Sequence, residues 1–102
     1  MFTIQILLPV RNNAGTPFPR STFDQVSRTL TERFGGVTAY IRAPASGAWQ
    51  DETGQVKMDD IVVYEVLTTD LDRDWWSDYR KTLEGLFQQE EIVIYGQKVW
   101  KL

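Results

Sequence analysis

The sequence has no cysteine and no histidine among its 102 residues. Without cysteine there can be no disulfide, no thiolate catalysis and no thiolate-bound zinc or iron–sulfur centre. Without histidine the chain lacks the side chain that most often moves protons near neutral pH, and also the commonest metal ligand. We therefore expect a protein without metal or cofactor, and a non-enzymatic role is favoured because no recognised catalytic motif is present.

The chain also lacks a surplus of positive charge and any long apolar run. Its 11 basic residues are outnumbered by 14 acidic ones, giving a net charge of −3. Nucleic-acid binders usually carry a basic stripe, so no nucleic-acid partner is expected. No apolar stretch approaches the ~20 residues that cross a bilayer, and the N-terminus does not have the pattern of a signal peptide. We expect a cytoplasmic protein without a membrane partner.

What is present is the composition of one ordinary globular domain, spanning 1–102, with 42% hydrophobic residues. Period-two alternation predicts a strand over 2–8, and helical spacing predicts a helix over 21–34. Ser21 and Asp24 have the form of a capping box, and Gly35 has the form of a helix C-cap. A second helix is predicted to start at Asp70 or Asp72 and to bury Trp76, Tyr79, Leu83, Leu86 and Phe87. Further strands are predicted over 37–42, 60–67 and 92–100, with an irregular connector over 43–56.

The order strand, helix, strand, strand, helix, strand predicts an α+β, ferredoxin-like βαββαβ fold. Right-handed crossovers give a four-stranded antiparallel sheet of order 4-1-3-2 with both helices on one face. An RNA-recognition motif has the same order of elements, but the third strand follows Asp59 and Asp60 rather than basic residues. Tyr64 is also expected to point inward, so stacking on RNA is not favoured.

The predicted fold leaves one sheet face without helices, and strand parity assigns side chains to it. We expect an interface there, formed by Gln5, Leu7, Ile61, Val63 and Val99. Thr3, Thr38 and Gln97 share the parity, although a bulge at Gly96 would shift the last strand. Because contiguous apolar side chains on a bare face usually meet a partner, a homodimer or a complex with another protein is the first functional hypothesis.

A cleft for a small molecule on the same face is the alternative hypothesis. Glu65 is the weak candidate for a general base, with Tyr40 or Tyr95 donating a hydrogen bond. A small anionic group would be held by arginine, whose planar fork of donors matches carboxylate or phosphate. The loops gathered at one end of the domain supply the remaining candidate ligand-binding residues, Arg11, Asn12, Arg42 and Trp49.

Three segments carry a resemblance to known proteins: Phe34-Gly35-Gly36-Val37-Thr38, Gly47-Ala48-Trp49, and Val62-Val63-Tyr64-Glu65-Val66. Together they resemble a class of small bacterial ferredoxin-like proteins whose role is unknown. The resemblance implies the fold and frequent dimerisation, but no reaction, because the motifs are turns and core strands. The dimeric α+β barrel proteins are similar by architecture alone.

Overall fold

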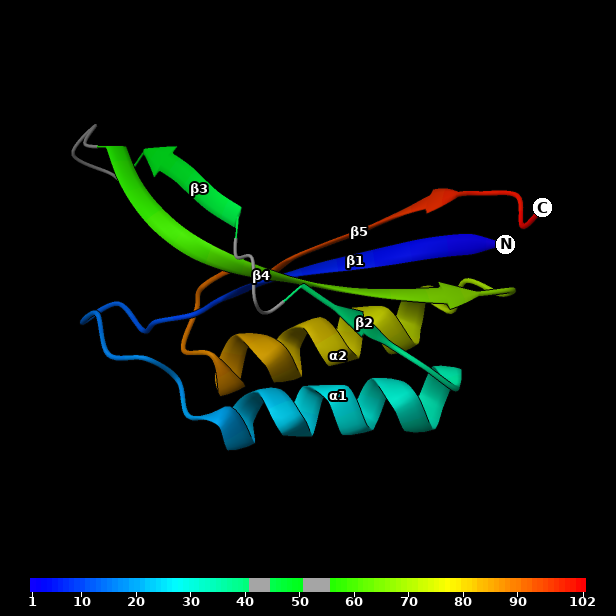
Figure 1. The fold of residues 1–102 in the computed structure, drawn as a ribbon, viewed down its shortest axis with the longest axis horizontal. Helices are drawn as coiled ribbons and strands as arrows, with labels where there is room; N and C mark the ends of the chain where they lie inside the picture. Colours follow the sequence, from blue (N-terminus) through cyan, green and yellow to red (C-terminus); the bar gives the residue numbers. More distant parts are fainter. Residues whose placement is uncertain (41–44, 51–55) are drawn as a thin grey trace.

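The computed structural model describes residues 1–40, 45–50 and 56–102, and of 45–50 and 56–59 it describes the backbone alone. The order of strands and helices along the chain is as follows: β1 Phe2–Pro9, α1 Arg20–Phe34, β2 Thr38–Ala39, β3 Ala45–Gln50, β4 Val56–Thr68, α2 Arg73–Leu86 and β5 Val93–Lys98. The two helices lie side by side beneath one face of the sheet, and none of the described residues forms a helix on the other face (Figure 1).

The sheet is antiparallel throughout, with the strand path β2-β4-β1-β5. In the numbering of the four predicted strands this path is 4-1-3-2, so the predicted ferredoxin-like α+β fold is confirmed. Strands β1 and β4 occupy the centre, where both edges of each are paired. The chain ends lie near one another at the same end of the domain (Figure 1).

The predicted irregular connector over 43–56 and the predicted start of the third strand at Asp60 are wrong. Strand β3 pairs with the first half of β4, from Ala45↔Ile61 to Gln50↔Val56. This ribbon curves away from the helices and extends past the end of β1, which pairs with β4 only from Ile61 onward (Figure 1). The predicted strand over 37–42 is observed as Thr38–Ala39, and residues 41 and 42 lie outside the described residues.

The helix ends follow the predictions only in part. The predicted capping box is wrong, because the N-cap of α1 is Pro19 and makes no side-chain cap hydrogen bond. The fixed backbone angle of proline suits a helix start, and the Pro19 carbonyl accepts a hydrogen bond from the Thr22 N–H at 3.0 Å. Gly35 is confirmed as a left-handed C-cap with φ 81. Asp72, one of the two predicted caps of α2, accepts a hydrogen bond from the Trp75 N–H.

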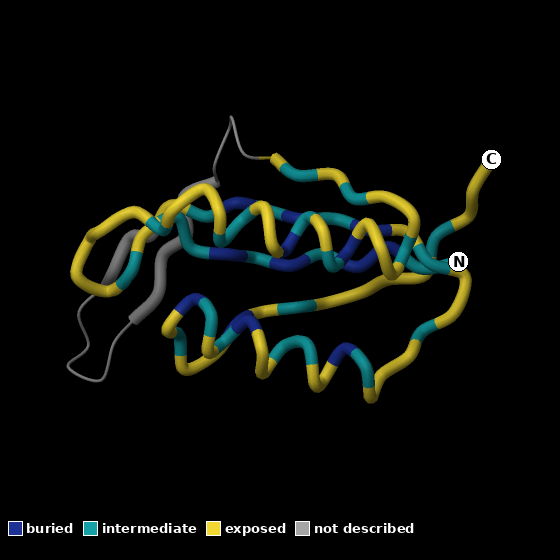
Figure 2. The backbone as a smooth tube through the Cα atoms, turned by 90° about the horizontal axis from the view of Figure 1, so that it is seen from below, coloured by how far each residue is buried: buried dark blue, intermediate teal, exposed yellow. Residues whose placement is uncertain are grey.

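The core lies between the sheet and the helices, and it uses the side chains that strand parity predicts. Figure 2 shows the buried positions alternating along the central strands and repeating along the inner sides of both helices. Burying each large aliphatic side chain contributes about 2 kcal/mol before the entropic cost of ordering it. The buried hydrophobic residues are Ile4, Ile6, Leu8, Val26, Leu30, Val62, Tyr64, Val66, Trp76, Leu83, Phe87 and Ile92.

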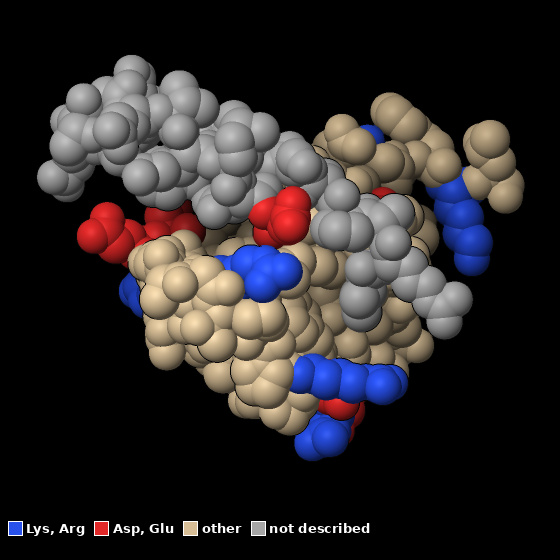
Figure 3. Space-filling view, turned by 60° about the vertical axis from the view of Figure 1, so that its left-hand side comes forward, with Lys and Arg blue, Asp and Glu red and all other residues tan. Residues whose placement is uncertain are grey.

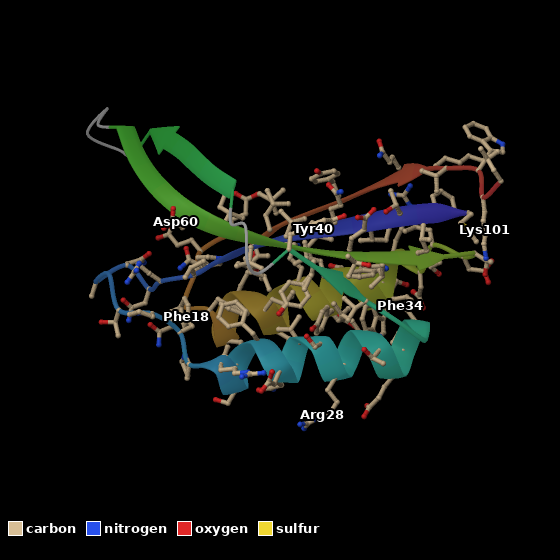
Figure 4. The ribbon with its side chains drawn as sticks, in the orientation of Figure 1. Phe18, Arg28, Phe34, Tyr40, Asp60 and Lys101 are labelled. Atoms are coloured by element: carbon tan, nitrogen blue, oxygen red, sulfur yellow. The ribbon has the colours of Figure 1, made fainter. Side chains whose placement is uncertain are left out.

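Aromatic side chains close both ends of this layer. Phe34, at the end of α1, stacks on Trp76 with ring centroids 5.2 Å apart and meets Trp75 edge to face. At the other end Phe18 packs edge to face against Phe87. Figure 4 shows Phe18 and Phe34 between the sheet and the helices, while Arg28 points away from the sheet. Aromatic side chains of the protein itself therefore close these two ends of the core.

Candidate functional site

The sheet face opposite the helices, called here the open face, is organised in rows that run across the strands. One row is apolar: Leu7 pairs with Val93 on β5 and with Val63 on β4. The next row is polar, because Gln5 pairs with Tyr95 on one side and with Glu65 on the other. Pairing across the sheet brings such side chains within contact distance of each other. The predicted interface candidates Gln5, Leu7 and Val63 thus share one surface with Tyr95 and Glu65.

Glu65 is held in place by two hydroxyl groups. The Thr3 hydroxyl donates to Glu65 Oε1 at 2.6 Å, and the Tyr40 hydroxyl donates to Oε2 at 3.0 Å. Thr3 is only 5% exposed, so its hydroxyl is committed to this contact. We call these three residues the Glu65 cluster. Its carboxylate has a fixed orientation and can still accept hydrogen bonds on its remaining lone pairs.

The carboxylate also changes the acidity of its tyrosine partner. The hydrogen bond to Glu65 and the negative charge of that group raise the pKa of Tyr40 above its ordinary value. Tyr40 therefore stays a protonated donor well into the alkaline range. On the neighbouring strands the Tyr95 hydroxyl donates to Gln5 Oε1, which gives a second tyrosine with a fixed orientation on the same face.

A cavity of about 820 Å³ borders the Glu65 cluster. It lies where the ends of β4 and α1 approach β2, and its wall includes backbone at Gly35 and Gly36. The size falls within the range of small-molecule sites, roughly 300–1,000 Å³. The side chains of its open-face wall are Thr3, Thr38, Glu65, Leu67, Gln97 and Val99.

Large hydrophobic side chains remain accessible on this face. Tyr40 is 48% exposed, Leu67 52%, Val93 49% and Tyr95 48%. Leu7, Val63 and the cluster lie between them. Scattered exposed hydrophobics are ordinary, but a group that shares one face of a sheet indicates a binding surface. On the side of the molecule drawn in Figure 3 the described charges of both signs are interspersed, without a basic patch.

Two of the loop residues predicted to bind an anion, Arg11 and Asn12, occupy a different part of the molecule. Arg11 and Asn12 follow β1, and Asn12 Oδ1 accepts hydrogen bonds from the N–H groups of Ala14 and Thr16 at 3.0 and 2.9 Å. Asn12 therefore closes its own turn. Arg11 Nη1 donates to the Gly15 carbonyl at 3.4 Å. No contact among the described residues joins either one to the Glu65 cluster, while Arg42 and the side chain of Trp49 lie outside the described residues.

Sequence reasoning placed Thr3 on the open face but missed its partnership with Glu65. Strand register alone gives Gln5 as the direct neighbour of Glu65, so the contact with Thr3 is diagonal. The available signal was that Thr3 lies two residues before Gln5, the residue that pairs with Glu65. Diagonal neighbours on a sheet remain within reach of longer side chains.

In the part of the chain that the structure describes, no helix is long and apolar enough to span a membrane.

Comparison with solved structures finds small proteins of the same architecture. A phage SAM lyase in complex with S-methyl-5'-thioadenosine superposes with a TM-score of 0.67 at 14% identity, covering 95% of this chain and 80% of that one. The same enzyme in its apo state gives 0.62, again at 14% identity, over 94% and 78%. A CutA1 variant from Pyrococcus horikoshii OT3 gives 0.62 at 13% identity, over 100% and 86%.

No protein-family model and no curated protein matches the sequence. At these identities the structural likeness shows the fold alone. The chain is thus a small ferredoxin-like α+β protein whose fold also occurs in the phage SAM lyase and in CutA1.

Proposed function

We propose that this protein is a homodimeric binding module in which the open face of one copy packs on that of another. The observation behind this proposal is the apolar row Val93–Leu7–Val63, flanked by the half-exposed Tyr40 and Tyr95, on a face that carries no helix. A surface of this kind gains free energy when it leaves water, at roughly 25 cal/mol per Å² of apolar area. We place the module in the bacterial cytoplasm, on the cysteine-free composition and the resemblance described above.

The shape of the sheet favours a second copy as the occupant over an unrelated protein. The ribbon of β3 and the first half of β4 extends beyond the helices, and a two-stranded ribbon without a layer beneath it is only marginally stable. A twofold interface would bring two such ribbons to each other's open face. Glu65 tolerates this burial better than a lone carboxylate would, because two hydroxyls already satisfy it.

Sedimentation equilibrium over a range of concentrations tests this proposal with substitutions on the open face. Val63→Asp and Val93→Lys each place a charge in the apolar row, so both are expected to shift the dimer to monomer. Gln25→Asp, on the exposed side of α1, is the matched control and should leave the mass unchanged. Two variants guard against misfolding, and circular dichroism checks each one. An unchanged mass in both folded open-face variants would overturn the proposal.

A second candidate function is supported by the Glu65 cluster and its cavity. A carboxylate fixed by two hydroxyls beside about 820 Å³ of space suits a small molecule that presents a hydrogen-bond donor or a cation. In this proposal Glu65 is the base or acceptor, and Thr3 and Tyr40 orient it by donating to its two oxygens. An anionic group on the same ligand would be held by Arg42 rather than by Arg11, whose guanidinium lies at the turn after β1.

Calorimetric titration tests the second candidate, and the phage SAM lyase with its bound S-methyl-5'-thioadenosine suggests the first two probes. S-methyl-5'-thioadenosine and S-adenosylmethionine would be titrated into the wild type, Glu65→Gln and Tyr40→Phe. Binding that weakens about tenfold or more in Glu65→Gln supports a ligand site at the cluster. Equal binding by all three proteins would place the probe elsewhere and contradict this candidate.

A further inference from the structure

The helix-covered side of the molecule holds a second cavity, distinct from the open face, where α2 passes the edge strand β5. It has a volume of about 370 Å³. On α2 it is lined by Arg73, Trp76, Ser77 and Arg80, whose spacing places them on one side of the helix. We call this cavity the α2–β5 groove.

The groove exists because β5 has a glycine at the position that faces the helix. Gly96 pairs with Ile4, and a Cβ built on Gly96 would lie 2.6 Å from Ile4 Cδ1. Ile4 thus takes part of the space that a side chain at position 96 would need, and the remainder stays empty. The floor beneath this space is apolar, because Phe2, Trp76 and Ile94 line it together with Ile4.

The rim of the groove is cationic. Arg73 and Arg80 contribute from α2, and Lys98 contributes from the end of β5. Among the described residues, no aspartate or glutamate lines it. This grouping of three positively charged side chains is notable in a chain whose net charge is −3. An apolar floor under three cations is complementary to a molecule with an apolar body and an anionic head.

Arg80 has a fixed place at this rim. Its Nη1 donates to Glu84 Oε2 at 3.0 Å, and the same oxygen accepts a hydrogen bond from the Ile92 N–H at 3.1 Å. Glu84 therefore ties α2 to the segment that enters β5 and holds one guanidinium beside the groove. The rest of that guanidinium keeps donors for an incoming anion, since arginine has five N–H groups.

We propose that the α2–β5 groove binds a small amphipathic anion, with a phosphate or carboxylate head at Arg73, Arg80 and Lys98 and an apolar tail on the floor. Tyr95 and Gln97 of the open face also line this groove, whereas its cations and its apolar floor lie on the helix side. The groove can therefore be occupied in monomer or dimer. The volume of about 370 Å³ sets the size of the tail to that of a short alkyl chain or a single aromatic ring.

Amide NMR titration with octyl phosphate tests the proposal. The expected result is saturable binding with chemical-shift changes at Gly96, Trp76 and Ser77, and with little change at Glu65. Inorganic phosphate supplies the head alone and octyltrimethylammonium reverses its charge, so both should bind at least about tenfold more weakly. Shift changes confined to the open face, or equal binding of the cationic probe, would overturn it.

Charge reversal at the exposed part of the rim gives the second measurement. Arg73→Glu combined with Lys98→Glu is expected to weaken octyl phosphate binding about tenfold or more. Lys81→Glu combined with Lys101→Glu has the same net charge change at exposed residues that do not line the groove, and binding should stay within about twofold. Equal weakening in both pairs would show only a general charge effect and contradict a site at the groove. If the wild-type protein does not bind octyl phosphate at millimolar concentration, the proposed site is also contradicted.

Discussion

Thr3 and Glu65 lie 62 positions apart in the chain, and a 2.6 Å hydrogen bond joins them across the two central strands. The contact pins the carboxylate of an open-face residue to a hydroxyl that is almost fully buried. Because Tyr40 holds the other carboxylate oxygen, the three side chains link β1, β4 and the segment that follows β2.

Thr3→Val removes the hydroxyl while keeping the shape of the side chain. Glu65 Oε1 then loses its donor in a partly buried place, so the free energy of unfolding should fall by about 1–2 kcal/mol. Urea unfolding measures the change, with Thr3→Ser as the control that keeps the donor. If Thr3→Ser destabilises the protein as much as Thr3→Val does, the hydroxyl is not the source of the effect.

Gly96→Ala is expected to destabilise the protein by about 1–3 kcal/mol, because the new Cβ meets Ile4 Cδ1 at 2.6 Å. Ile4→Val removes that methyl group, so in the double variant the cost of Gly96→Ala should shrink. Thermal or urea unfolding of the four proteins in this double-mutant cycle gives the coupling energy. Strictly additive effects would show that the two side chains do not compete for the same space.

Asp72 connects the start of α2 to α1 with its two carboxylate oxygens. Oδ1 accepts from the Trp75 N–H at 3.0 Å, and Oδ2 pairs with Arg33 at 3.2 Å. Asp72→Ala should cost about 1 kcal/mol of stability, most of it from the lost cap, since exposed ion pairs contribute little. Asp72→Asn keeps a capping oxygen and should cost much less. Equal losses in the two variants would assign the effect to the ion pair instead.

The raised pKa of Tyr79 predicts how the free energy of unfolding changes at alkaline pH. Burial disfavours the charged phenolate and raises the pKa of Tyr79 to about 12 from 10.0. The folded state therefore holds this proton more tightly than the unfolded state, so stability is lost as pH rises from 10 toward 12. Urea unfolding at a series of pH values should show this fall, and Tyr79→Phe should make it shallower. An identical pH dependence in the variant would contradict the assignment.

Strand parity was enough to predict the central sheet and the membership of its two faces. Ile4, Ile6 and Leu8 are buried, and the residues between them lie on the open face. In the third predicted strand the face was assigned from Glu65, whose carboxylate would be costly beneath the helices, and Val62, Tyr64 and Val66 on the other side are buried. The prediction succeeds here because a one-residue shift would move every hydrophobic side chain of such a strand to the wrong face.

Strand β3 could not be predicted in the same way. Ser46 and Gly47 have low strand propensity, and the segment becomes a strand through its pairing with β4. The predicted capping box at the start of α1 was wrong because the backbone of Pro19 replaces the side-chain cap expected at Ser21. The α2–β5 groove also had no sequence signal, because it depends on Gly96 lying opposite Ile4. Strand β3 and the groove are thus set by partners distant in the chain, whereas the start of α1 is set by its own backbone.

Native mass spectrometry of the wild-type protein, purified gently and diluted in steps, tests the proposed self-association most directly. The account predicts a dimer that gives way to monomer only on dilution. An additional small mass on that dimer would identify a ligand carried by the protein and support a small-molecule site as well. A monomer at every concentration would contradict a homodimer built on the open face.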